Sequence, residues 1–125
     1  MKAWTHLIAV LAFGIASHAQ ATCTRPDPPA PPPDGKTATM DQMLTAKHDF
    51  DRYNGEMNTY LDCVTLEMDS APKDTSAMSP DEKKAHDQQQ KALVAKHDAA
   101  VDELKSVVGK FNEQLRIFKA KQAKK

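Results

Sequence analysis

The longest periodic stretch of the chain is SPDEKKAHDQQQKALVAKHDAAVDELKSVVGKFNEQLRIFKAKQ, residues 79–122, and it decides the fold class. It opens on a capping box, in which the Ser79 hydroxyl and the Glu82 carboxylate satisfy the first free N–H groups of a helix, while Pro80 suits the first helical position. Core-compatible residues then recur at alternating spacings of four and three, namely Leu93, His97, Ala100, Leu104, Val107, Phe111, Leu115 and Phe118. This spacing keeps them on one face and predicts a helix over residues 80–122.

A second helix is predicted over residues 39–69. Thr39 and Gln42 form its capping box. Its apolar face is formed by residues seven apart and by a neighbouring stripe: Met43, Phe50, Met57 and Val64, with Ala46, Tyr53, Tyr60, Leu61 and Met68. Pro72 ends this helix, and residues 70–79 form a loop.

Two long helices joined by a short loop favour an antiparallel hairpin, so the predicted fold class is all-α. Folding the chain about the loop places Phe50 opposite Ala100 and Met43 opposite Val107. In this register the end of the second helix projects past the start of the first.

The segment before the first helix, residues 22–38, is rich in proline. Such a run takes the stiff polyproline II form. Pro33-Asp34-Gly35 predicts a turn, because proline presets one dihedral angle and Gly35 allows a positive φ. The part of the segment that precedes this turn is long enough to run back along the first helix as a third layer. The alternative is a disordered tether.

The first 21 residues predict a signal peptide. Lys2 provides a short positive region, residues 7–15 are mainly apolar, and Ala19-Gln20-Ala21 fits the cleavage rule. We expect cleavage after Ala21, with Ala19 as the second choice. The mature chain, residues 22–125, is then a single domain in the periplasm or outside the cell.

Two cysteines, Cys23 and Cys63, remain after cleavage. In an oxidising compartment an intramolecular disulfide is the default, and closing a loop of this length stabilises a fold by roughly 4 kcal/mol. A metal pair or an intermolecular bond are the alternatives.

Four short motifs occur along the mature chain: Cys23-x-Arg25-Pro26, Pro33-Asp34-Gly35 with Ala38-Thr39, Tyr60-Leu61-x-Cys63 and Phe111-Asn112-x-x-Leu115-Arg116. Together they resemble a group of small exported two-cysteine helical proteins of Gram-negative bacteria. The resemblance covers nearly all of the mature chain, and it implies a periplasmic setting and the two-cysteine arrangement, without any activity. The capping sequence Ser79-Pro80-Asp81-Glu82 is also similar to a capping motif of the periplasmic chaperones Spy and CpxP.

The residues do not predict an enzyme, a cofactor or a bound metal. No serine lies in a nucleophile context, and no glycine-rich phosphate loop is present. His48 and His97 are the only candidate metal ligands that the hairpin would bring near each other, and a metal site usually needs three or four. The chain has 17 basic and 17 acidic residues, which argues against a nucleic-acid binder.

The predicted function is therefore that of a non-enzymatic binding or structural module of the cell envelope, with a protein partner or self-association. A periplasmic chaperone for unfolded clients is one alternative, and binding to an anionic membrane surface is another. The predicted contact is the projecting helix end, unless the Pro33-Asp34-Gly35 turn covers it as core. The residues of this candidate contact are Leu115, Arg116, Ile117, Phe118, Lys119 and Lys121.

Overall fold

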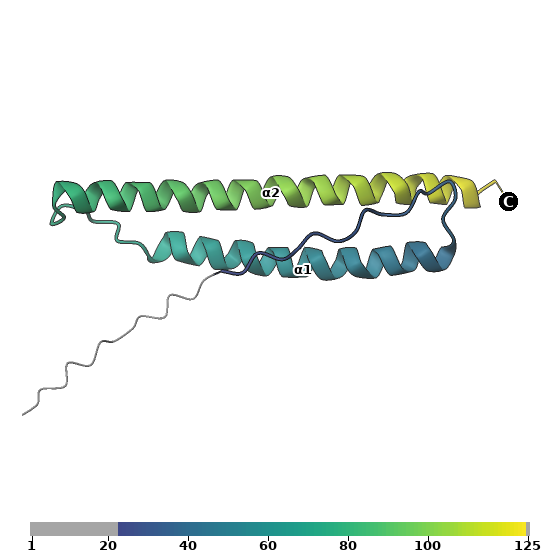
Figure 1. The fold of residues 1–125 in the computed structure, drawn as a ribbon, viewed down its shortest axis with the longest axis horizontal. Coiled ribbons are helices and arrows are strands. Elements are labelled where there is room, and N and C mark those ends of the chain that lie inside the picture. Colours follow the sequence, from purple (N-terminus) through teal and green to yellow (C-terminus); the bar gives the residue numbers. More distant parts are fainter. Residues whose placement is uncertain (1–22, 125) are drawn as a thin grey trace, which may run out of the picture.

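The computed structural model describes residues 23–124, and this part of the chain contains two α-helices and no strand. Helix α1 spans Met40–Ser70 and helix α2 spans Pro80–Gln122. They lie side by side and run in opposite directions (Figure 1). The all-helical fold class is confirmed. The predicted signal peptide, residues 1–21, lies outside the described residues.

Both helices begin with the predicted capping boxes. The Thr39 hydroxyl accepts a hydrogen bond from the Gln42 N–H at 3.2 Å, and the Gln42 side chain accepts one from the Thr39 N–H at 2.9 Å. Ser79 and Glu82 make the same reciprocal pair at 3.4 and 2.7 Å. Four N–H groups at the helix starts are thereby satisfied, which fixes where each helix begins.

The core lies between the two helices. Tyr53, Met57 and Val64 of α1 are its largest fully buried side chains. Every buried helical residue is one that the sequence periodicity placed inside: Met43, Tyr53, Met57, Tyr60 and Val64 of α1, and Leu93, Ala100, Phe111 and Phe118 of α2.

The predicted register between the helices is wrong. The Phe50 ring stacks on Phe111, with ring centroids 4.7 Å apart, and does not face Ala100. The loop over residues 71–79 extends along the helix axis, so α2 starts well beyond the end of α1 (Figure 1). Since α2 has 43 residues and α1 has 31, most of the excess length of α2 lies at the loop end and little of it at the C-terminal end.

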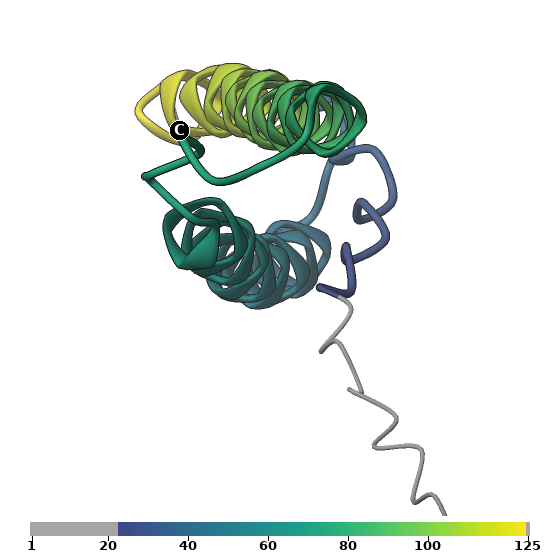
Figure 2. The ribbon, with the colours of Figure 1, turned by 90° about the vertical axis from the view of Figure 1, so that its left-hand side faces the viewer.

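We call residues 23–33 the strap. It runs along one side of the helix pair, and the view along the helices shows it next to both α1 and α2 on that side (Figure 2). Cys23 is bonded to Cys63 of α1, with the two Cα atoms 5.7 Å apart, so the predicted pairing is confirmed. Neither α1 nor α2 has an apolar stretch of the length that spans a bilayer.

The strap joins α1 through a tight turn at residues 34–38. The Asp34 carbonyl accepts hydrogen bonds from the N–H groups of Thr37 and Ala38, and the Asp34 carboxylate accepts one from the Lys36 N–H. Gly35 does not use the positive φ that glycine allows, since no described glycine has one. Glycine is needed there because a Cβ on Gly35 would lie 2.3 Å from the backbone oxygen of Gln114.

Candidate functional site

Glu103 of α2 joins the strap to both helices. Its carboxylate accepts a hydrogen bond from the Tyr53 hydroxyl of α1 at 2.6 Å and an ion-paired one from Arg25 of the strap at 2.5 Å. Tyr53 is completely buried, whereas Arg25 is partly exposed. A buried donor left without an acceptor is costly, so this junction holds the three layers together in addition to the disulfide.

The Tyr53 hydroxyl is a structural donor. Burial raises the pKa of Tyr53 well above its ordinary value of 10.0, and the hydrogen bond to Glu103 raises this pKa further. The phenol therefore stays protonated at neutral pH and keeps its proton directed at the carboxylate. A group in this state serves neither as a base nor as a nucleophile.

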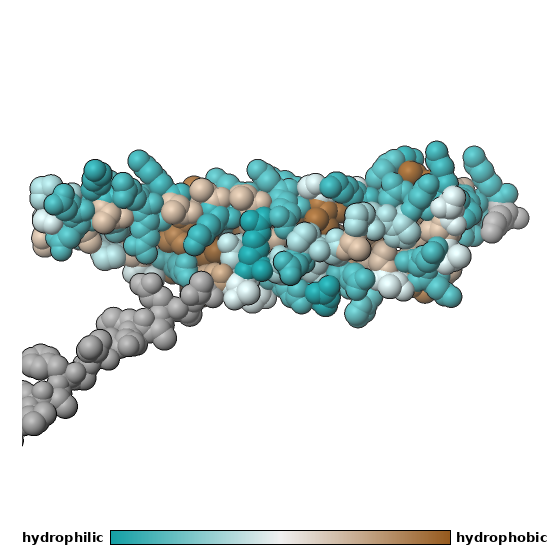
Figure 3. Space-filling view, in the orientation of Figure 1, coloured by the Kyte–Doolittle hydropathy of each residue, from teal (hydrophilic) through white to brown (hydrophobic). Residues whose placement is uncertain are grey.

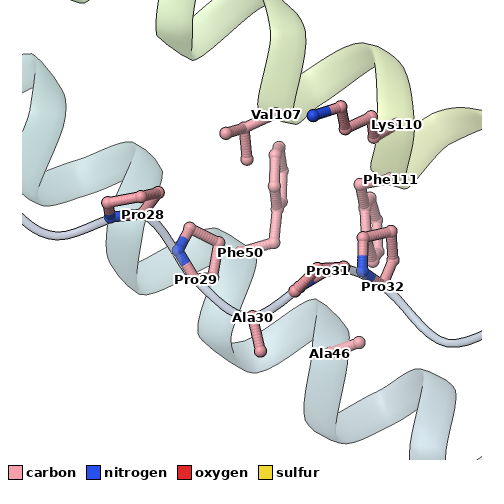
Figure 4. A pocket seen from close by; sticks show the side chains of 10 residues that line it. All are labelled: Pro28, Pro29, Ala30, Pro31, Pro32, Ala46, Phe50, Val107, Lys110 and Phe111. Carbon is pink, nitrogen blue, oxygen red and sulfur yellow. The ribbon is translucent and has the colours of Figure 1, made fainter.

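A pocket of about 210 Å³ lies between the strap and the two helices (Figure 4). The stacked rings of Phe50 and Phe111 and the proline rings form its walls, and Lys110 is its single charged group. Its lining residues offer apolar contact and one ammonium group, with no carboxylate, imidazole, thiol or hydroxyl for acid–base or nucleophilic chemistry. They are Pro28, Pro29, Ala30, Pro31, Pro32, Ala46, Phe50, Val107, Lys110 and Phe111.

The face that carries the strap is mostly hydrophilic. Figure 3 shows small, separate apolar patches among polar side chains, and no broad apolar surface on this face. The strap therefore covers the apolar surface that the helices would otherwise expose on this side.

The predicted contact at the end of α2 is largely covered. Phe118 is 4% exposed and packs with Ala38 and Met43, so the structure places it in the core. Leu115 and Ile117 are partly buried. The register explains this placement, because α2 ends close to the start of α1 and the turn at residues 34–38 folds over it.

The basic residues of this segment have separate surroundings. The Lys121 ammonium donates to the Ala38 carbonyl at 3.1 Å and lies 5.9 Å from the centre of the Phe118 ring. Arg116 pairs with Glu113 one turn earlier, and this hydrogen bond lowers the pKa of the Glu113 carboxyl. Lys119 is exposed. Arg116 and Lys119 are therefore exposed to solvent. The apolar side chains that we expected to be exposed beside them are buried or partly buried.

Within residues 23–124 no group of three ligand atoms includes a histidine. His48 is 81% exposed, and the partly buried His97 lies beside Asp98, with Nδ1 and Oδ1 3.5 Å apart. In the described part of the chain, one group of three ligand atoms lies within 4.8 Å, formed by Cys23, Cys63 and Glu67. Both of its sulfurs are used in the disulfide, so it does not provide thiolate ligands.

A row of apolar residues follows the flank of α2 that the strap leaves uncovered. Val94 is 47% exposed and the other three members are partly exposed. At 3.6 residues per turn the row points about 150° away from the flank that carries Glu103 and Lys110, which meet the strap. We call it the open row, and its members are Val94, Val101, Val108 and Leu115.

Sequence reasoning missed Glu103 and most of the open row. Glu103 follows Ala100 by three residues, so an acid beside the core stripe was the available signal. For the row the signal was a strict seven-residue repeat, which the stronger stripe through Phe111 obscured.

No family model, no characterised protein and no solved structure matches this chain.

Proposed function

We propose that this chain is an exported, non-enzymatic protein of the cell envelope that acts as a binding and structural module. Its working unit is the mature domain, residues 22–125, an antiparallel hairpin whose proline-rich segment is tied back by the disulfide. The Cys23–Cys63 bond supports this setting, since such bonds persist in oxidising compartments.

The observation that carries the binding role is the one-sided cover of α2. The strap shields one flank, and the open row on the other flank leaves Val94, Val101 and Val108 partly in water. Apolar rows on a small rigid helix pair are typical of surfaces that receive another helix. The strap braces the pair through Glu103, so the row is presented on a fixed framework.

A chaperone for unfolded clients is the second candidate. Apolar side chains away from the open row favour it: Met40, Leu44 and Leu66 are 54%, 57% and 70% exposed. Scattered apolar groups suit clients without a fixed shape. Suppression of the aggregation of a reduced model client would distinguish this role, and Leu66→Glu should weaken it while leaving a specific partner bound.

Binding to an anionic membrane is less well supported, because Phe118 is buried beneath the turn and cannot insert into lipid. Flotation with vesicles that contain phosphatidylglycerol tests it directly. Recovery of the protein in the floating fraction would favour the membrane role over the binding module.

Site-specific photocrosslinking in exporting cells tests the binding role. A benzoylphenylalanine at position 101 should yield discrete adducts, whereas the same group at Lys110, on the strap flank, should not. Adducts of equal yield at both positions, or none at position 101, would contradict a binding surface along the open row.

A further inference from the structure

We propose that the open row binds a second copy of this chain, with the two α2 helices antiparallel across a two-fold axis at Val101. This inference rests on the proposed binding role and names its partner. The resulting assembly has four helices, with one strap on each outer flank.

The spacing of the open row is self-complementary. In an antiparallel pair centred on Val101, that residue faces its own copy, and Val94 of each chain faces Val108 of the other. A contact related by a two-fold axis must be complementary to itself in this way. At each end of the contact Leu115 lies opposite Asp87 of the other chain, so the apolar part of the contact consists of the three valines.

The charges beside the row are complementary in the same register. Asp98 of each chain lies next to Lys105 of the other, and Asp87 lies next to Arg116, so one axis produces four ion pairs. All four groups are accessible to a partner: the side chains of Asp87, Asp98 and Arg116 are 73%, 70% and 70% exposed, and Lys105 is exposed. Arg116 would share its guanidinium between Glu113 of its own chain and Asp87 of the partner. A parallel copy would instead place each of these charges against its own kind, which costs free energy.

The contact is large enough for a dimer. From Asp87 to Arg116 the helix is about 44 Å long at 1.5 Å per residue, and a helix is about 12 Å wide. Each copy then buries roughly 500 Å², and the pair reaches about 1,000 Å², the lower limit for a specific interface. We expect a dimer that dissociates on dilution and weakens with salt.

Charge reversal provides a test that only this register passes. Asp98→Lys places two lysines together twice per dimer, and Lys105→Asp places two aspartates together twice. Each variant alone should dimerise at least about tenfold more weakly than the native chain. An equimolar mixture should recover the native affinity, because the heterodimer contains opposite charges at both positions.

Sedimentation equilibrium of the oxidised mature protein measures these affinities. Lys84→Asp, an exposed reversal on another part of α2, is the matched control and should remain dimeric. Circular dichroism should show all variants folded, since Asp98 and Lys105 are exposed.

A native chain that is monomeric at all concentrations, variants that dimerise normally, or a mixture that fails to recover would each overturn the proposal. If the chain is monomeric but position 101 still crosslinks to another protein, the second copy is excluded while the binding role stands.

Discussion

At the scale of single residues, the need for glycine at position 35 comes from close packing against α2 and not from an unusual backbone conformation. Gly35 has an ordinary negative φ, yet its missing side chain lets the turn contact the backbone of α2 at Gln114 and Phe118. Its N–H donates to the Gln114 side chain at 2.9 Å, which holds the turn against that helix. Gly55, in contrast, has open space where a Cβ would lie.

Two glycine substitutions should therefore act in opposite directions. We expect Gly35→Ala to lower the free energy of unfolding by about 1–3 kcal/mol, because the methyl group must displace backbone atoms. Gly55→Ala should raise it by up to about 1 kcal/mol, since alanine favours the helix and nothing is in the way. Urea unfolding followed by circular dichroism measures both. Equal effects of the two changes would show that the turn does not rest on α2.

The Tyr53–Glu103 hydrogen bond should give the protein a distinctive response to alkali. The pKa of Tyr53 is raised in the folded state by burial, so above pH 10.0 the unfolded chain loses this proton first. The contribution of protonated Tyr53 to the free energy of unfolding is complete below pH 10.0 and is lost as the pH rises further. We expect the free energy of unfolding to fall above pH 10.0 more steeply in the native chain than in Tyr53→Phe.

The Phe variant is also the control, because it keeps every other titrating group. At pH 7 it should be less stable by about 1–2 kcal/mol, since Glu103 loses a hydrogen bond. Identical pH profiles for the two proteins would mean that Tyr53 is exposed to solvent in the folded state.

At the scale of elements, the strap acts as the third layer that two helices need. Its pocket contacts involve Phe50 and Phe111, and its ends are fixed by the disulfide and by the turn at residues 34–38. The helices alone leave these rings without cover on this side. The disulfide should therefore affect the whole fold rather than one end of it.

Reduction should lower the melting temperature markedly. Loop closure over about 40 residues stabilises a fold by roughly 4 kcal/mol, which corresponds to more than about 10 °C for a domain of this size. Calorimetry with and without reductant measures the change. The Cys23→Ser/Cys63→Ser double variant should melt at the reduced temperature under both conditions. A melting temperature that reductant leaves unchanged in the native chain would contradict the role of the strap.

The end of α2 should behave as core. Phe118→Asp buries a carboxylate beside Ala38 and Met43, so we expect a loss of more than about 3 kcal/mol. Lys119→Asp, next to it and exposed, should change stability by less than about 0.5 kcal/mol. Thermal melts of both variants decide this. A Phe118→Asp protein that melts normally but loses its partners would restore the contact role that the sequence suggested.

The helices could be predicted from the sequence because their signals are local. Thr39 with Gln42 and Ser79 with Glu82 mark the helix starts within four residues, and the apolar period identifies the inner faces. The register could not be predicted, since it depends on how far the loop extends along the axis. For that reason the sequence left open whether Phe118 is core or contact, and the structure places it in the core.

At the scale of the whole molecule, the protein is a helix pair that is covered on one flank and open on the other. Glu103, the disulfide and the turn fix the strap on one flank, and the open row stays partly exposed on the other. The composition does not indicate this asymmetry, because the chain has equal numbers of basic and acidic residues. The asymmetry results from the position of the strap on one side of the helices.

The proposed role of this protein depends most on export, cleavage and closure of the disulfide, and intact-mass spectrometry of periplasmic protein tests these together. The predicted mass is that of residues 22–125 less two hydrogen atoms, with a Thr22 N-terminus and no thiol that reacts with iodoacetamide before reduction. A chain that still begins at Met1, or one whose Cys23 and Cys63 are alkylated without reduction, would contradict the proposed role.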